Sequence, residues 1–235
     1  MPIKYGTGRG GFTLTEMMIG IMISGMVLAS LAAIHATSTT HMFQNYRQNT
    51  IKNGASFAMK TVMSRLAAST RIDSPAFGVS GNILAIAENV DQLTGCHPIR
   101  AGSARQWHYF CRYTATNANC PSGSCLMYHT GAITAGGGTC PNGPAWAPSY
   151  PAFCGPGGGG VVTRLTDNIN VSSFSLFSRR AADGVNERDA VRVRVRVSWT
   201  PSVALSRSAR PVDSTLDSTG SIQRSVCNSA LPGCS

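Results

Sequence analysis

Apolar residues form one long uninterrupted stretch near the N-terminus. Residues 12–34 read FTLTEMMIGIMISGMVLASLAAI, and no Asp, Glu, Lys or Arg occurs between Met17 and Tyr46. At 1.5 Å per residue, 23 helical residues span roughly 35 Å, enough to cross the apolar part of a bilayer. Lys4 and Arg9 precede the stretch, which favours a cytoplasmic N-terminus. The pattern predicts a single membrane-spanning helix over 12–36, with the rest of the chain outside the cytoplasm.

The pattern changes after the apolar stretch but stays helical. A polar bridge, HATSTTH, is followed by residues that recur at three- and four-residue steps: Phe43, Tyr46, Thr50, Gly54, Phe57 or Ala58, Val62 and Leu66. This spacing predicts an amphipathic continuation over 37–70, with that face packed on a folded head. No proline lies between Pro2 and Pro75, so one helix from about 13 to 69 is expected.

Residues 71–235 have the alternation and turn chemistry of a β-rich head. In Ala190–Thr200 four valines and Trp199 alternate with three arginines, which predicts a strand with one buried face. Further strands are expected within 79–90, 105–114, 125–130 and 168–178, the last joined to 190–200 by a hairpin loop over 180–189. The expected fold class is α+β: one long N-terminal helix packed on a small antiparallel sheet with disulfide-stapled loops.

The cysteines indicate where the head resides. There are eight, all in the last 140 residues: Cys96, Cys111, Cys120, Cys125, Cys140, Cys154, Cys227 and Cys234. An even count confined to one region is typical of a disulfide framework in an exported domain. Zinc is the alternative, but the close C-x-x-C pairs of a zinc ribbon are absent, and we expect no metal. Short separations favour the pairs 120–125, 227–234, 140–154 and 96–111.

Between the strands, residues 136–160 contain 14 Gly or Pro among 25 and are expected to form a long loop.

Composition argues against an enzyme. Charged residues make up 13% of the chain, with ten carboxylates and five scattered histidines. Neither a nucleophile elbow, nor a metalloprotease helix, nor a nucleotide fingerprint is present, so we expect neither catalysis nor a cofactor.

The junction between the basic leader and the apolar stretch carries a motif. Gly11-Phe12-Thr13-Leu14-Thr15-Glu16 resembles the processing site of type IV prepilins and of the related pseudopilins of type II secretion. The resemblance implies a leader over 1–11, cleavage between Gly11 and Phe12 by a prepilin peptidase, and N-methylation of Phe12. It also implies that Glu16 pairs with the N-terminal amine of a neighbouring subunit during assembly. Intramembrane carboxylates are costly unless paired, which agrees with that role.

The resemblance further implies other major and minor pilins as partners, bound through the N-terminal helix. The inner membrane would hold the subunit before assembly, and a surface pilus afterwards. Major pilins usually carry a proline late in the membrane segment, where this chain has Ala33. That departure favours a minor subunit. A long helix followed by paired strands resembles the PilW-like minor pilins and the larger pseudopilins.

Three functions therefore stay open. The first is a minor pilin that primes assembly and lies near the pilus tip, and the second is a type II secretion pseudopilin. The third is a pilus-tip binding module for DNA or surfaces: Arg192, Arg194 and Arg196 would project from one strand face about 6.6 Å apart, close to the spacing of phosphates. Solvated arginines that cover apolar neighbours are the favoured interpretation of that row, so nucleic acid is a weaker prediction.

Overall fold

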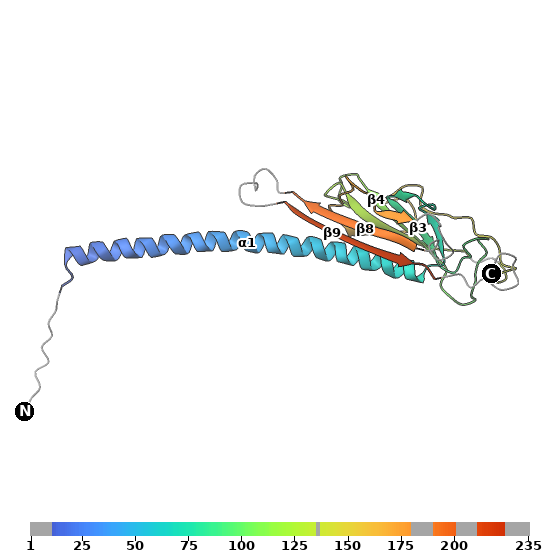
Figure 1. Cartoon of the computed structure of the whole chain (residues 1–235), viewed down its shortest axis with the longest axis horizontal. Coiled ribbons are helices and arrows are strands. Elements are labelled where there is room, and N and C mark those ends of the chain that lie inside the picture. Colours follow the sequence, from blue (N-terminus) through green and yellow to red (C-terminus); the bar gives the residue numbers. More distant parts are fainter. Residues whose placement is uncertain (1–10, 135–136, 180–189, 201–210, 224–235) are drawn as a thin grey trace, which may run out of the picture.

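A helix longer than the head itself dominates the molecule (Figure 1). The computed structural model describes residues 11–134, 137–179, 190–200 and 211–223. Helix α1 (Leu14–Ala68) has 55 residues, so it is about 82 Å long. It begins at the N-cap Thr13 and ends at Ser69, which confirms the single helix expected from the sequence.

Two antiparallel sheets make the head. The larger has the order β1 (Arg71–Ser74), β3 (Ile83–Ala87), β4 (Gln106–Tyr113), β5 (Cys125–Ala132) and β6 (Val161–Thr166). The smaller has the order β2 (Ser80–Gly81), β7 (Phe177–Arg179), β8 (Ala190–Trp199) and β9 (Val212–Ser221). The α+β fold class is thereby confirmed, with two sheets where one was expected.

The principal core lies between α1 and the sheets. The valines of β8 turn one buried face inward, and Ala55, Ala58, Val62 and Leu66 of α1 are fully buried against this core. Gly220 of β9 lies so close to the helix that an added Cβ would be 2.6 Å from Met63 and 2.8 Å from Leu66. The absence of a side chain at this point allows β9 to pack directly on α1.

The helical stripe expected to bind the head is only half correct. Ala58, Val62 and Leu66 do face the core, but Phe43, Tyr46 and Phe57 are exposed. The described head contacts α1 from Arg47 onward, where the guanidinium lies 4.2 Å from the centre of the Trp199 ring, and the described residues leave Phe43, Tyr46 and Phe57 exposed. Regular spacing shows that residues share a face and does not show what covers it.

The strand predictions were mostly confirmed. The expected strands at 105–114, 125–130 and 190–200 are β4, β5 and β8, and the segment 79–90 contains β2 and β3. Within 168–178 only Phe177 and Ser178 belong to a strand, β7, which pairs with β8 as expected. The hairpin loop at 180–189 lies outside the described residues. Strand β9, which pairs with β8 from Ala190↔Ser221 to Trp199↔Val212, was not predicted.

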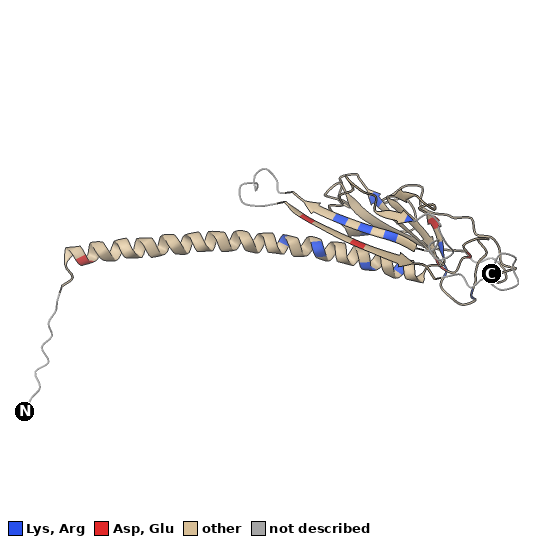
Figure 2. Cartoon of the chain, viewed as in Figure 1, with Lys and Arg blue, Asp and Glu red and all other residues tan. Residues whose placement is uncertain are grey.

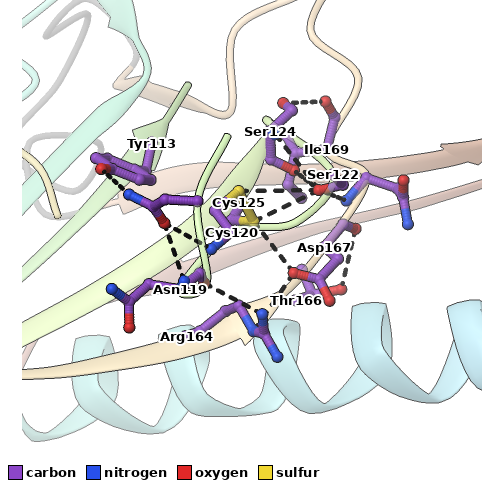
Figure 3. Close-up of a disulfide and its surroundings, with 12 residues drawn as sticks. Tyr113, Asn119, Cys120, Ser122, Ser124, Cys125, Arg164, Thr166, Asp167 and Ile169 are labelled. Carbon is purple, nitrogen blue, oxygen red and sulfur yellow. Dashed lines mark hydrogen bonds and ion pairs between the residues drawn. A yellow bond between two sulfur atoms is a disulfide. The ribbon is translucent and has the colours of Figure 1, made fainter. Parts of the chain in front are cut away.

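Three disulfides are described, and two of the expected pairings were wrong. Cys120–Cys125 is present (Figure 3), whereas the other two bonds are Cys96–Cys140 and Cys111–Cys154 rather than 96–111 and 140–154. Both of the corrected bonds join the Gly/Pro-rich loop to the larger sheet and its adjoining loop. The expected pair of Cys227 and Cys234 lies outside the described residues.

The Gly/Pro-rich loop is held by more than disulfides. Trp146 is buried in a second apolar cluster with Trp107 and Tyr109, and Tyr150 packs against that cluster. The Tyr150 hydroxyl donates a 2.7 Å hydrogen bond to Asp73. The two aromatic side chains therefore anchor the loop on the sheet and are not free to stack on a ligand.

Candidate functional site

The candidate processing site lies just before the helix. Gly11 and Phe12 are exposed and precede the helix, and Phe12 leaves 83% of its surface accessible. A Cβ added at Gly11 would meet no atom within 4 Å. Folding does not require glycine here, so a requirement for glycine would come from whatever recognises this segment.

Glu16 is built into the start of the helix as part of a capping box. The Thr13 hydroxyl accepts a hydrogen bond from the Glu16 backbone N–H at 3.3 Å, and the Glu16 carboxylate accepts one from the Thr13 N–H at 2.9 Å. The Thr13 hydroxyl also lies 2.9 Å from the carboxylate. These bonds satisfy two of the N–H groups that every helix N-terminus leaves free. In the single subunit, the carboxylate is therefore partnered within its own chain, although it is fully exposed to a neighbour.

The apolar part of α1 meets no other part of the described chain. Large side chains from Leu14 to Ile34 are more than half exposed, and no residue of the most apolar window is buried. By length and composition α1 is the one helix among the described residues that could cross a membrane. A surface this apolar requires lipid or another protein around it.

Three threonines of the polar bridge that follows bond their hydroxyl groups within the helix. Thr37 donates to the Ala33 carbonyl at 2.8 Å, Thr39 to His35 at 3.0 Å and Thr40 to Ala36 at 2.9 Å. Hydroxyls bonded one turn back need no water, so these three threonines can enter a protein interface without leaving their own donors unsatisfied.

The arginine row on β8 does not form a bare cationic track. Arg192 binds Asp217 through two nitrogens, at 2.9 and 2.6 Å, and Arg194 reaches the same carboxylate at 3.0 Å. Arg196 pairs with Asp213. Both aspartates come from β9, so two carboxylates serve three guanidinium groups (Figure 2). Contact with nucleic acid stays a prediction. A phosphate backbone would have to displace these ion pairs or bind to the positive charge by which the three arginines exceed the two aspartates.

Sequence reasoning missed two buried polar groups in the larger sheet. His108 is fully buried and bonds Glu88 and the Tyr128 hydroxyl, each at 2.8 Å. His129 lies beside the Cys111–Cys154 disulfide, where one ring nitrogen accepts from the Gly155 N–H and the other bonds the Gly159 carbonyl, both at 3.0 Å. The joined sulfurs and the occupied imidazole leave this trio no ligand atoms for a metal. The alternation within β4 and β5 could have indicated burial of both histidines, but not their partners.

Residues 7–32 match the family model described as the prokaryotic N-terminal methylation motif. No curated protein and no solved structure matches the chain. The match covers the leader junction, Phe12, Glu16 and most of the apolar segment. It supports a member of the type IV pilin and pseudopilin group, and with the exposed apolar helix it fits a membrane-anchored pilin-like prepilin.

Proposed function

We propose that this protein is a minor pilin of a type IV pilus, cleaved after Gly11, methylated on Phe12 and incorporated through its apolar helix. The observation that carries the proposal is the apolar surface of α1 from Leu14 to Ile34, which is entirely unburied and has Glu16 near its start, within the methylation motif. A carboxylate at the edge of such a surface is costly in lipid, and a neighbour's N-terminal amine would relieve that cost.

A minor role is favoured over that of a major subunit. The helix runs through Ala33 without interruption, at the position where major pilins usually have a proline. The head carries disulfides and a long anchored loop, features that suit a subunit exposed at the pilus tip and help it survive outside the cell. Priming of assembly follows from the same helix, since it presents the surface on which the next subunit packs.

The test of this proposal uses Glu16→Val. The variant should be processed and inserted into the membrane, because removal of a charge from lipid is favourable by itself. Its amount in sheared pili should fall strongly relative to wild type, because a neighbour's amine loses its partner. Met17→Leu, which keeps the helix apolar one residue away, is the matched control and should be incorporated normally. Normal incorporation of Glu16→Val would overturn the assembly role.

A pseudopilin of a type II secretion system is the second candidate, because the methylation motif belongs to both groups. Deletion of the chain separates the two. Loss of surface pili, twitching and DNA uptake with intact protein secretion supports the minor pilin. A secretion defect with normal pili supports the pseudopilin.

A further inference from the structure

His129 lies beside the Cys111–Cys154 disulfide in a protonation state that suits a metal ligand. The Gly159 carbonyl can only accept a hydrogen bond and the Gly155 N–H can only donate one. The Nδ1 atom of His129 therefore carries the proton, and Nε2 keeps a lone pair. A backbone carbonyl that bonds one ring nitrogen is a usual outer partner of a metal-binding histidine, because it fixes the tautomer and the ring. His129 is also fully buried, so packing holds the ring in this orientation.

Paired strands place Cys111 and His129 next to each other. Cys111 of β4 pairs with Met127 of β5, and His129 of β5 pairs with Tyr109 of β4. Residues that face each other across two strands share one face of a sheet, as do residues two apart along a strand, so Cys111 and His129 are diagonal neighbours. The sulfurs of Cys111 and Cys154 and one ring nitrogen of His129 all lie within 4.8 Å of one another. The sheet thus positions two of these atoms, and the Gly/Pro-rich loop supplies the third.

The loop that carries Cys154 is able to move when the disulfide opens. Five of the six residues that follow Cys154 are glycines, and a glycine backbone adopts a wide range of conformations. The N–H group that occupies Nε2 of His129 belongs to Gly155, the residue directly after Cys154. A shift of the Cys154 sulfur away from Cys111 would therefore also withdraw this N–H and uncover the lone pair of His129.

The chemistry of the three groups selects the cation. A dithiol gives two electrons and two protons to the disulfide, which becomes two thiols while the dithiol itself becomes a disulfide. A metal ion that binds both sulfurs then releases both thiol protons. Two thiolates and a neutral imidazole are typical ligands of Zn²⁺, at about 2.3 Å for sulfur and about 2.0–2.1 Å for nitrogen. Ligand atoms at these distances from a tetrahedral ion are about 3.5–3.8 Å apart, which is inside the 4.8 Å that already encloses the three atoms.

We propose that reduction of the Cys111–Cys154 disulfide converts Cys111, Cys154 and His129 into a binding site for Zn²⁺, with water as the fourth ligand. The disulfide and the ion are alternative links between the Gly/Pro-rich loop and the larger sheet, because each joins Cys154 to Cys111. The oxidised head has no such site, since its sulfurs are bonded to each other and the lone pair of His129 accepts from Gly155. The proposal does not depend on the role of the chain in a pilus.

The other two described disulfides lack an equivalent third ligand. His97 follows Cys96, but both of its ring nitrogens lie 2.9 Å from backbone carbonyl oxygens and are not open to a metal. Beside Cys120–Cys125 the neighbouring carboxylate is that of Asp167, which lies 3.1 Å from the Cys125 sulfur and pairs with Arg164 at 3.4 Å (Figure 3). These two disulfides therefore provide matched controls within the same chain.

Thiol protection in the wild-type chain tests the site without any substitution. The full chain, purified in detergent and reduced with a phosphine, is alkylated with and without Zn²⁺, and each cysteine is followed by mass spectrometry of its peptide. Zn²⁺ should slow the alkylation of Cys111 and Cys154 at least about tenfold, because a thiolate bound to metal is not free to react. The cysteines of the other two described disulfides should be alkylated at an unchanged rate. Equal alkylation of Cys111 and Cys154 with and without Zn²⁺, or protection of other cysteines instead, would overturn the proposal.

Substitutions test the three ligands through the Zn²⁺ affinity of the reduced chain, measured by competition with a chromophoric chelator. His129→Gln, and Cys111→Ser together with Cys154→Ser, should each weaken binding by more than about a hundredfold, which exceeds the usual effect of losing an outer partner. His97→Gln is the matched control and should bind Zn²⁺ as tightly as wild type. All chains are compared in the reduced state, so the serine variant loses no disulfide relative to wild type.

Trp fluorescence of each reduced variant shows whether its head is folded. If His129→Gln unfolds, the serine variant and the alkylation of wild type decide the question. Unchanged affinity in the serine variant, an equal loss in His97→Gln, or equally tight binding by the oxidised wild-type chain would each overturn the proposal.

Discussion

The fold changes the ionisation of two aspartates of β9, Asp213 and Asp217. Hydrogen bonds from Arg196 hold the pKa of Asp213 below its ordinary value, and hydrogen bonds from Arg192 and Arg194 do the same for Asp217. Partial burial opposes the shift and is outweighed. The carboxylates thus stay ionised to lower pH in the folded protein than in the unfolded chain.

The lowered pKa values predict a pH-dependent contribution to stability. A carboxyl with a depressed folded pKa stabilises the fold above its unfolded pKa of about 4, and this contribution disappears as pH falls through the folded pKa. The variant Asp213→Asn with Asp217→Asn should therefore melt at a lower temperature than wild type at pH 7. As the pH falls through the lowered folded pKa values of the two carboxyls, the two melting temperatures should approach each other. A difference in melting temperature between variant and wild type that is constant across pH would contradict a contribution from these ion pairs.

At the residue scale, the N-terminal residues and those of β8 differ in what the sequence can indicate. The roles of Gly11, Phe12 and Glu16 could be predicted because the motif that contains them is local, and the family model matches that motif over residues 7–32. The partners of Arg192, Arg194 and Arg196 could not be identified, because they depend on the register of a strand that begins more than ten residues later and is joined by a segment without a clear turn signal.

At the scale of elements, β8 and β9 show why one strand was predicted and the other missed. β8 alternates valine with arginine, whereas β9 reads VDSTLDSTGS and has only Val212 and Leu216 as large apolar residues. As the edge strand of its sheet, β9 needs little apolar surface of its own, since the valines of β8 supply the buried face. Hydrophobic alternation therefore identifies the inner strand and does not identify its neighbour.

The wrong disulfide pairings have a geometric cause. Cys96 lies in the loop after β3, whereas Cys111 is five residues into β4, about 17 Å along the strand from Gln106. Bridged cysteines need Cα atoms within roughly 4.4–6.8 Å. A short separation in sequence does not meet this condition when one cysteine lies within a strand, and the long loop that crosses the sheet supplies the partner instead.

The observed pairs predict unequal contributions to stability. Cys111 and Cys154 are 43 residues apart, and Cys120 and Cys125 are five apart. In the chain-entropy model these loops correspond to about 4 and about 2 kcal/mol. Replacement of Cys111 and Cys154 by alanine should thus lower the free energy of unfolding more than replacement of Cys120 and Cys125. Denaturant titrations followed by Trp fluorescence measure this difference, and a reversed order would contradict the pairing.

At the scale of the whole molecule, one helix serves three environments in turn. Its first part meets no other part of the described chain, its middle exposes Phe43, Tyr46 and Phe57, and its last part contributes buried residues to the head's core. The sequence predicted the helix and its length, since no proline interrupts it. It did not show where the head begins on the helix, because that depends on how far the two sheets extend.

A pair of substitutions tests which face of α1 carries the head. Leu66 is fully buried, so Leu66→Ala should lower the free energy of unfolding of the head by about 2–5 kcal/mol. Phe57→Ala removes a larger side chain that is 57% exposed and should change it by no more than about 0.5 kcal/mol in the monomer. Denaturation in detergent, well below the concentration at which subunits associate, measures both. Equal losses would place Phe57 against the head.

Mass spectrometry of the N-terminus of the protein purified from its native membrane tests the central claim most directly. A chain that begins at Phe12 and is heavier by one methyl group is the expected result, with Gly11→Val retaining the leader that carries Lys4 and Arg9. An unmethylated N-terminus after Ala36 would show that the apolar stretch is a secretory signal. That result would contradict the assignment to prepilins and the assembly role of α1.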